Sequence, residues 1–177
     1  CEKRGVFLIS DEVWSDFVFA PAQHISTTQV SPYAHEHTIT LNGASKTFNL
    51  AGLHASYSIV YSGELRHAYH KLSDASHCNA PNTLSLAALI GAYTGGRAYV
   101  DELVSYIRRN MELVHGFIGR EVPNVRSYLP EGTYTMWLDF TATGRSEEEN
   151  SRRMGAEGLG IPPAADYNGN NWFPMQT

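Results

Sequence analysis

A single lysine, Lys46, stands among small and hydroxyl-bearing residues in the segment Gly43-Ala44-Ser45-Lys46-Thr47. The segment follows the β-rich run Thr38–Leu41 and precedes a turn at Gly52. A lysine held at a strand end, with neighbours small enough for a flat ligand to approach, is suited to form an imine with an aldehyde. Lysines are also common as solvated surface charges, and this segment taken alone favours that second interpretation.

A carboxylate, Asp11, supports the chemical interpretation. It follows the apolar run Val6–Ile9, which is typical of a strand buried on both faces of a parallel sheet. Open α/β sheets bind their ligands at the ends of such strands. The separation of Asp11 from Lys46 fits a crossover to a neighbouring strand, so we expect the two groups to converge on one ligand. Asp11 alone could equally cap a helix through Glu12–Trp14.

The segments around these two residues resemble fold-type I pyridoxal-phosphate enzymes. Within the class I and II aminotransferase superfamily, the flanking residues are most similar to the MalY/PatB-type cystathionine β-lyases. The resemblance runs in order through nearly the whole chain. The matching segments are Ile9-Ser10-Asp11-Glu12-Val13-Trp14, Ala44-Ser45-Lys46-Thr47-Phe48-Asn49-Leu50-Ala51-Gly52-Leu53, Asn79–Asn82, Pro130–Tyr134 and Met136–Phe140.

This resemblance implies part of an aspartate aminotransferase-like α/β fold, with a mostly parallel sheet in a large domain and an α+β small domain. Residues 1–97 would form the C-terminal half of the cofactor-binding domain, 98–120 an interdomain helix, and 121–177 part of the small domain. Because the chain opens at Cys1 without a methionine and its first strand begins almost at once, we expect a fragment that lacks an N-terminal part.

The resemblance also implies roles for three residues. Lys46 would form the Schiff base with pyridoxal 5'-phosphate and shuttle the proton taken from the substrate α-carbon. Asp11 would pair with the pyridine nitrogen and keep it protonated, which makes the ring an electron sink. Ser45 is placed to donate to the cofactor phosphate, although a structural hydroxyl fits this position nearly as well.

Three positions depart from the family pattern. Trp14 stands where many relatives have a tyrosine that bonds the cofactor's phenolic oxygen, and its indole N–H can donate but cannot titrate. His54 stands where many have a phosphate-binding arginine, which members of the lyase branch often lack too. Pro174 falls where an arginine would hold the substrate carboxylate, and proline offers no donor. Either the alignment of the tail has slipped, or the chain binds amino-acid substrates poorly.

Hydrophobic periodicity and breaker residues predict the remaining elements. Strands are expected at 5–10, 38–41, 55–61, 125–129, 133–140 and 159–161, and loops around 26–32 and at 167–174. Helices are expected from Gly63, from Thr83 to Gly95, from Ala98 to Ile118, and from the acidic run at Ser146. In the helix from Ala98, a stripe at helical spacing is predicted to pack in the core: Leu103, Tyr106, Ile107, Asn110, Met111, Val114 and Phe117.

Composition narrows the function classes. The 177 residues are 42% hydrophobic and 18% charged with a formal net charge of -5, which suits an ordinary globular protein and argues against nucleic acid as the main partner. No apolar run reaches the roughly 18 residues that span a bilayer. Two cysteines, Cys1 and Cys78, form no disulfide framework, so a cytoplasmic location is expected. The eight histidines are interpreted as scattered surface residues without a metal.

The function implied by the resemblance is a pyridoxal-phosphate-dependent carbon–sulfur β-lyase acting on amino acids through a Schiff base at Lys46. An aminotransferase of the same superfamily is the alternative. A hypothesis from another class is a truncated, non-catalytic remnant that acts as a scaffold or interaction protein, which Pro174 and His54 favour. Because relatives usually build their site across a two-fold axis, we expect a homodimer.

Overall fold

The computed structural model describes residues 1–160 and 171–177, and the chain forms two compact units. The first comprises residues 1–17 and 23–102, and the second comprises residues 18–22 and 103–177. The boundary between residues 102 and 103 falls inside the long helix α5 (Arg97–Glu121). The domain bounds 1–97, 98–120 and 121–177 stay a prediction.

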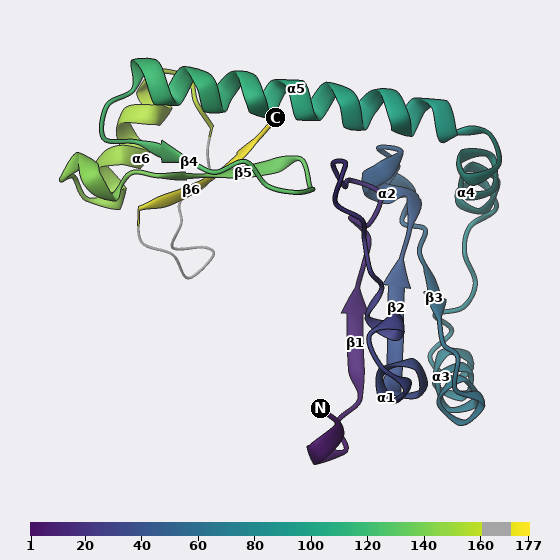
Figure 1. Ribbon diagram of the computed structural model, residues 1–177. Helices are drawn as coiled ribbons and strands as arrows, with labels where there is room; N and C mark the ends of the chain where they lie inside the picture. The colour runs from purple at the N-terminus through teal and green to yellow at the C-terminus, as the bar shows by residue number, and fades with distance from the viewer. Residues whose placement is uncertain (161–170) are drawn as a thin grey trace. The chain divides into compact units, whose positions relative to one another are not determined.

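The sheet of the first unit contains β1 (Leu8–Asp11), β2 (Thr38–Asn42) and β3 (Tyr57–Ile59), in the order β1-β2-β3 (Figure 1). β1 and β2 are parallel, with Asp11 opposite Leu41, whereas β3 runs antiparallel to β2. All three predicted strands are therefore confirmed within a few residues. The expectation that β1 is buried on both faces is wrong in this structure, because Ile9 is 74% exposed.

Four α-helices belong to this unit: α1 (Pro32–His37), α2 (Ala44–Thr47), α3 (Gly63–Ala75) and α4 (Thr83–Gly95). The sequence predicted α3 and α4, whose N-caps are Ser62 and Asn82. It does not predict α1, because Pro32 indicates irregular structure when only the sequence is considered. Pro32 instead occupies the first turn of the helix, where its missing N–H costs nothing, and the Ser31 hydroxyl caps the helix at Ala34 N.

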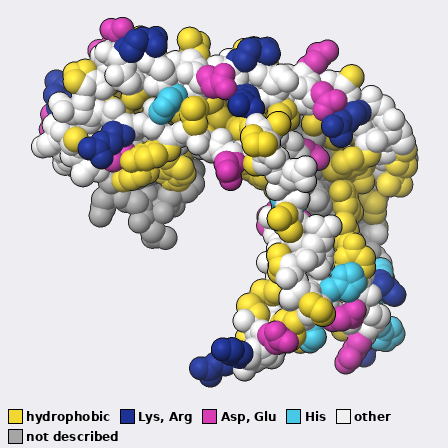
Figure 2. All heavy atoms as spheres, in the orientation of Figure 1, with side chains coloured by type: hydrophobic (Ala, Val, Ile, Leu, Met, Phe, Trp, Pro, Cys, Tyr) yellow, Lys and Arg dark blue, Asp and Glu magenta, His cyan; other side chains and the backbone are white. Residues whose placement is uncertain are grey.

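Helix α4 is apolar on all sides and carries no charged residue. Its buried residue is Ser85, whose hydroxyl donates to the carbonyl of Leu53. Leu84, Leu86 and Ile90 are exposed. Figure 2 shows the hydrophobic side chains gathered over this helix. The hydrogen bond of Ser85 therefore ties α4 to the turn at Leu53, while much of its apolar surface stays exposed.

The second unit packs α5 and α6 (Glu147–Ala156) with a sheet of β4 (Arg126–Ser127), β5 (Thr135–Asp139) and β6 (Trp172–Gln176). Side chains alternate along β5, so that Met136 and Leu138 enter the core while their neighbours stay partly exposed. Helix α6 begins at the predicted acidic run, where the Ser146 hydroxyl caps Glu149 N. The core of this unit also contains the buried residues Met111 of α5, Met154 of α6 and Phe173 of β6.

Two expectations for this unit need correction. The segment 172–176 is the strand β6, not a loop; it lies at the edge of the sheet, where Pro174 removes no needed ladder bond. Residues 167–170 of the expected loop lie outside the described residues, as does Ile161 of the strand expected at 159–161, whose other two residues form no strand. In α5, Ile107 and Met111 are buried as predicted, but Tyr106 and Phe117 are exposed.

A close contact at the end of α4 generates the first prediction. A Cβ added at Gly96 would collide with the ring of Phe48 and with the carbonyl of Ala92, whereas a Cβ at Gly95 would meet nothing within 4 Å. Gly96→Ala should therefore lower the free energy of unfolding by about 1–3 kcal/mol. Gly95→Ala is the matched control and should cause no loss. Urea denaturation of both variants measures the difference, and equal stabilities would contradict the expectation.

Candidate functional site

The parallel pairing of β1 and β2 brings the two predicted functional residues to the same edge of the sheet. Asp11 is the last residue of β1, and its partner Leu41 lies one residue before the end of β2. Helix α2, which carries Lys46, begins two residues after β2 ends and lies directly beyond that end of the strand (Figure 1). Lys46 is thus on a one-turn helix and not on the strand end that the sequence suggested.

Both charged groups are exposed and available. Oδ1 of Asp11 accepts a hydrogen bond from Val13 N at 3.3 Å, and its other oxygen has no partner among the described residues. Residues 13–16 form a turn, so Asp11 does not cap a helix. Within the same described part of the chain, Lys46 forms no ion pair or hydrogen bond through its amine. The sheet edge therefore presents an unneutralised carboxylate and an unneutralised amine.

Three contacts hold the one-turn helix α2. The Asn42 side chain accepts a hydrogen bond from Gly43 N at 2.9 Å. Any side chain at Gly43 would bring its Cβ to 3.0 Å from the Ala55 carbonyl oxygen, which explains the glycine by close backbone approach. Thr47, 1% exposed, donates through Oγ1 to Oδ2 of Asp16 at 2.8 Å. This last bond ties the helix to the turn that follows Asp11.

The other residues predicted to bind the cofactor lie near Asp11 or Lys46 in the sequence. Ser45 is half-buried on α2, beside Lys46 in the chain, and Trp14 is half-buried in the turn after Asp11. His54 is exposed and has a left-handed backbone with a φ of 52° after the 3-10 turn Ala51–Leu53. The roles of these three residues stay predictions.

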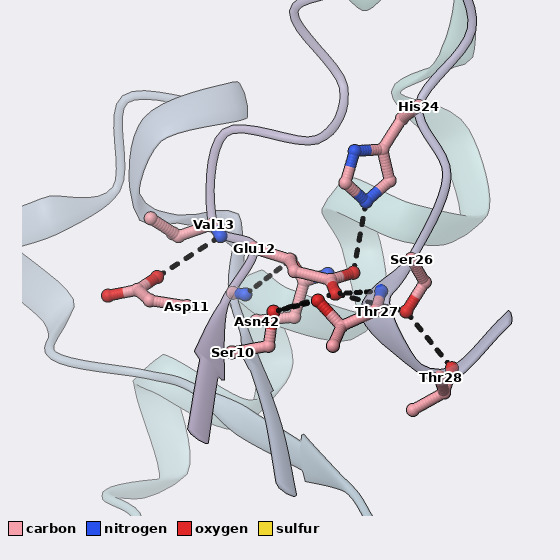
Figure 3. A network of polar contacts seen from close by, with 10 residues as sticks. Ser10, Asp11, Glu12, Val13, His24, Ser26, Thr27, Thr28 and Asn42 are labelled. Atoms are coloured by element: carbon pink, nitrogen blue, oxygen red, sulfur yellow. Dashed lines mark hydrogen bonds and ion pairs between the residues drawn. The ribbon is translucent and has the colours of Figure 1, made fainter. Parts of the chain in front are cut away.

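Glu12 is a residue that the sequence did not single out. It is 8% exposed, and Oε1 accepts hydrogen bonds from the hydroxyls of Ser10 and Ser26 and from Thr27 N, at 2.9–3.0 Å. Oε2 lies 3.0 Å from Nε2 of His24 (Figure 3). Asp11 points away from this network. The cluster of hydroxyl residues at 26–28 was the only signal in the sequence for such a buried acceptor.

The network controls the ionisation of Glu12. Burial alone raises the pKa of its carboxyl, but the hydrogen bonds with His24, Thr27, Ser10 and Ser26 outweigh burial and lower the pKa to about 2. Glu12 is therefore anionic at neutral pH. It anchors the segment 24–27 to the strand end that carries Asp11.

A cluster of aromatic rings forms around Phe48, which follows Lys46 by two residues in the chain. The Phe48 ring meets Tyr93 edge-on at 5.5 Å and stacks with Tyr99 at 6.1 Å, measured between ring centroids. Tyr93 also meets Tyr57 edge-on at 5.8 Å. Burial, and to a smaller extent the hydrogen bond with Tyr57, raises the pKa of the Tyr93 phenol. This aromatic cluster connects the end of α2 to α4 and to β3.

The histidines of α1 stack on aromatic rings. His37 lies 3.9 Å from the Tyr33 ring and His35 lies 4.1 Å from the Tyr61 ring, centroid to centroid. In the described ranges, 1–160 and 171–177, no three histidine, cysteine or acidic side chains are grouped to hold a metal ion. A search of the same ranges finds no helix with the length and apolarity that a membrane crossing requires.

In the second unit, Pro174 is buried in β6 opposite Trp137 of β5. The position is therefore part of a sheet edge, and its ring provides no hydrogen-bond donor. The idea that it replaces a carboxylate-binding arginine stays a prediction.

Comparison with known proteins gives consistent matches. A family model described as aminotransferase class I and II matches residues 1–169. The cystathionine β-lyase PatB of Bacillus subtilis (strain 168) is 33% identical over 168 residues, which cover 94% of this chain and 43% of that protein. A pyridoxal-phosphate-bound protein from Clostridium difficile 630 has a TM-score of 0.94 at 27% identity, over 99% of this chain and 46% of that one.

The fold is also that of an aspartate aminotransferase double mutant from Thermus thermophilus, with a TM-score of 0.84 at 24% identity over 99% of this chain and 44% of the other. The predicted aspartate aminotransferase-like α/β fold is thereby confirmed. The chain spans less than half the length of the relatives that it matches.

The ionisation of Glu12 generates the second prediction. Because its pKa in the folded protein is lowered from 4.5 to about 2, the ionised group adds stability above pH 4.5, and this contribution disappears as the pH falls towards 2. Glu12→Gln should lower the free energy of unfolding at pH 7 by about 1–3 kcal/mol and should have much less effect near pH 2.

Denaturant unfolding at the two pH values tests this expectation. The control is Glu36→Gln, which changes an exposed carboxylate in the same unit and should alter stability at neither pH. An effect of Glu12→Gln that is the same at pH 7 and pH 2 would show that the ionised form is not what the network stabilises.

Proposed function

Because the chain belongs to the class I and II aminotransferase family, we propose that it is part of a pyridoxal-phosphate-dependent carbon–sulfur β-lyase of the cystathionine β-lyase type. The similarity to PatB supports the lyase branch. Since the chain covers less than half of such relatives, the activity proposed is that of the whole protein to which this chain corresponds.

The observation that carries the proposal is the pair of unneutralised groups at one edge of the parallel strands. Lys46 provides an amine for the aldehyde of pyridoxal 5'-phosphate, and Asp11 provides a carboxylate for its pyridine nitrogen. The chemistry of these two groups fits the cofactor, because each keeps its charge available. Ser45 and His54 are the residues proposed to bind the phosphate, and Trp14 the one that donates its indole N–H.

When bound, the cofactor supplies an electron sink for negative charge that develops at the substrate α-carbon. The Asp11 carboxylate would pair with the pyridine nitrogen and keep it protonated. The Lys46 amine would hold the cofactor and would act as the general base that takes the α-proton. The turn at 13–16 and helix α2 keep the carboxylate and the amine at the same sheet edge.

The remaining features of the proposal concern the substrate, the assembly and the location. The substrate is an amino acid with a sulfur leaving group, and the protein acts as a homodimer in the cytoplasm. Residues 1–97 belong to the cofactor domain, 98–120 to the connecting helix and 121–177 to the small domain. No nucleic acid or membrane partner is proposed.

An aminotransferase is the second candidate, and the family match supports it directly. Both reactions begin with removal of the α-proton, so Asp11 and Lys46 would serve either one. A non-catalytic scaffold is supported by Pro174, which offers no donor for a substrate carboxylate.

Cofactor attachment to Lys46 is the third prediction. The chain has three lysines, Lys3, Lys46 and Lys71, and all are exposed, so the other two serve as internal controls. After incubation with pyridoxal 5'-phosphate and reduction with borohydride, peptide mass spectrometry should find the label concentrated on Lys46. Lys46→Ala should abolish the visible absorbance band and reduce turnover by about 100–10,000-fold, whereas Lys71→Ala should change neither. Equal labelling of all three lysines would contradict the proposal.

The choice between lyase and aminotransferase is the fourth prediction. With cystathionine as the substrate, a β-lyase releases pyruvate, ammonia and a thiol without a keto-acid acceptor, because the amino group leaves as ammonia and is not transferred to an acceptor. We expect product formation that does not depend on added keto acid. Product formation only in the presence of a keto-acid acceptor would identify the aminotransferase. No reaction of cystathionine, with or without the acceptor, would favour the scaffold.

A further inference from the structure

The hydrogen bond between Thr47 and Asp16 joins the two chain segments that leave the parallel strands. Thr47 follows Lys46 directly on α2, and Asp16 closes the turn that begins after Asp11 and Glu12. The bond is 2.8 Å long and connects residues 31 positions apart in the sequence. It is therefore a tertiary link between the carboxylate side and the amine side of the site.

Helix α2 needs such a link because it is only four residues long. A single helical turn fixes several backbone dihedrals for one hydrogen bond, so it is not stable by itself. Its internal bond runs from Phe48 N to the Ala44 carbonyl at 3.0 Å. Lys46, as part of this turn, has no contact of its own through its amine within the described residues. The position of the amine therefore depends on what its neighbours bind.

The Thr47 bond is a directed contact and not a general consequence of burying a threonine. Two other threonines of the same unit, Thr38 and Thr40, are also fully buried, and their hydroxyls have no hydrogen-bond partner in the described part of the chain. A threonine can therefore be buried in this sheet without a hydrogen bond from its hydroxyl. At Thr47, the hydroxyl instead reaches an anionic acceptor at an exposed residue, a charge-assisted bond of the stronger kind.

We propose that Thr47 and Asp16 are positioning residues that hold the Lys46 turn in register with Asp11. This inference rests on the proposed function, because it assigns the two residues to the geometry of the lysine that would bind the cofactor. Thr47 holds α2 from its buried side, and Asp16 fixes the far end of the bond on the turn after β1. Loss of either partner releases the turn while β1, β2 and the charges of Lys46 and Asp11 stay in place.

The experiment compares Thr47→Val, Thr47→Ser and Thr40→Val. Valine removes the hydroxyl at nearly constant shape, serine restores it, and Thr40→Val removes a buried hydroxyl that has no partner. Asp16→Ala removes the acceptor at an exposed position, so it does not depend on refilling a core site. Two readouts are measured: borohydride-trapped pyridoxal phosphate on Lys46 relative to Lys3 and Lys71, and hydrogen–deuterium exchange of the backbone amides of residues 43–50.

We expect Thr47→Val and Asp16→Ala to lower labelling of Lys46 by about 10-fold, with unchanged labelling of Lys3 and Lys71. The amides of 43–50 should exchange about 10-fold faster in both variants. Thr47→Ser and Thr40→Val should match the unsubstituted protein in both readouts. Wild-type exchange in Thr47→Val and Asp16→Ala, or the same acceleration in Thr40→Val, would overturn the proposal.

The two readouts separate this inference from the proposed function. If the unsubstituted protein labels its three lysines equally, the proposed function fails, and the exchange of residues 43–50 still decides whether Thr47 and Asp16 hold the turn. If Lys46 is selectively labelled but neither variant changes label or exchange, the cofactor assignment stands and the positioning role is wrong.

Discussion

The parallel register of β1 and β2 is the constraint on which the site depends. With Leu8 opposite Thr38 and Asp11 opposite Leu41, both strands leave the sheet at the same edge. The ladder continues one step further, because Glu12 N donates to the Leu41 carbonyl at 2.9 Å. A shift of one residue would turn Asp11 to the opposite face of the sheet. The register therefore decides both where the carboxylate lies and which side of the strand it occupies.

The pleat explains why two adjacent carboxylates have opposite environments. Successive side chains of an extended chain point to opposite faces, so Asp11 faces solvent while Glu12 enters the network shown in Figure 3. The Glu12 carboxylate accepts hydrogen bonds that hold the segment 24–27, and these bonds lower its pKa. Asp11 keeps one oxygen without a partner among the described residues, so it has an acceptor left for the ligand that we propose. Of these two neighbours, Glu12 has the structural role.

Local signals in the sequence were sufficient for much of the fold. An apolar run located β1, and β-rich runs located β2 and β3. The caps Ser62, Asn82 and Ser146 lie where the predicted helices begin. The errors arose where a residue type has two structural meanings. Proline breaks most helices and strands, yet Pro32 starts α1 and Pro174 fits an edge strand.

The site was predictable in part for a related reason. Asp11 and Lys46 could be recognised because each follows an apolar or β-rich run, and parallel strands end at a common edge. The Glu12 network and the bond from Thr47 to Asp16 could not be recognised, because both join segments that are distant in sequence and depend on side-chain direction. Hydrophobic periodicity predicts which face of an element a residue occupies, but it does not predict its hydrogen-bond partner.

The arrangement separates the step shared by related reactions from the steps that distinguish them. In the proposed function, removal of the α-proton would depend on the Lys46 amine and the Asp11 carboxylate, which α2 and β1 carry. Discrimination between loss of a thiolate and return of the proton depends on the groups that surround the substrate side chain and carboxylate. A family can therefore keep the strand register and the α2 turn while its other residues change. In this chain, Pro174 lies in the edge strand β6, a position that accepts a proline because no ladder hydrogen bond is needed there.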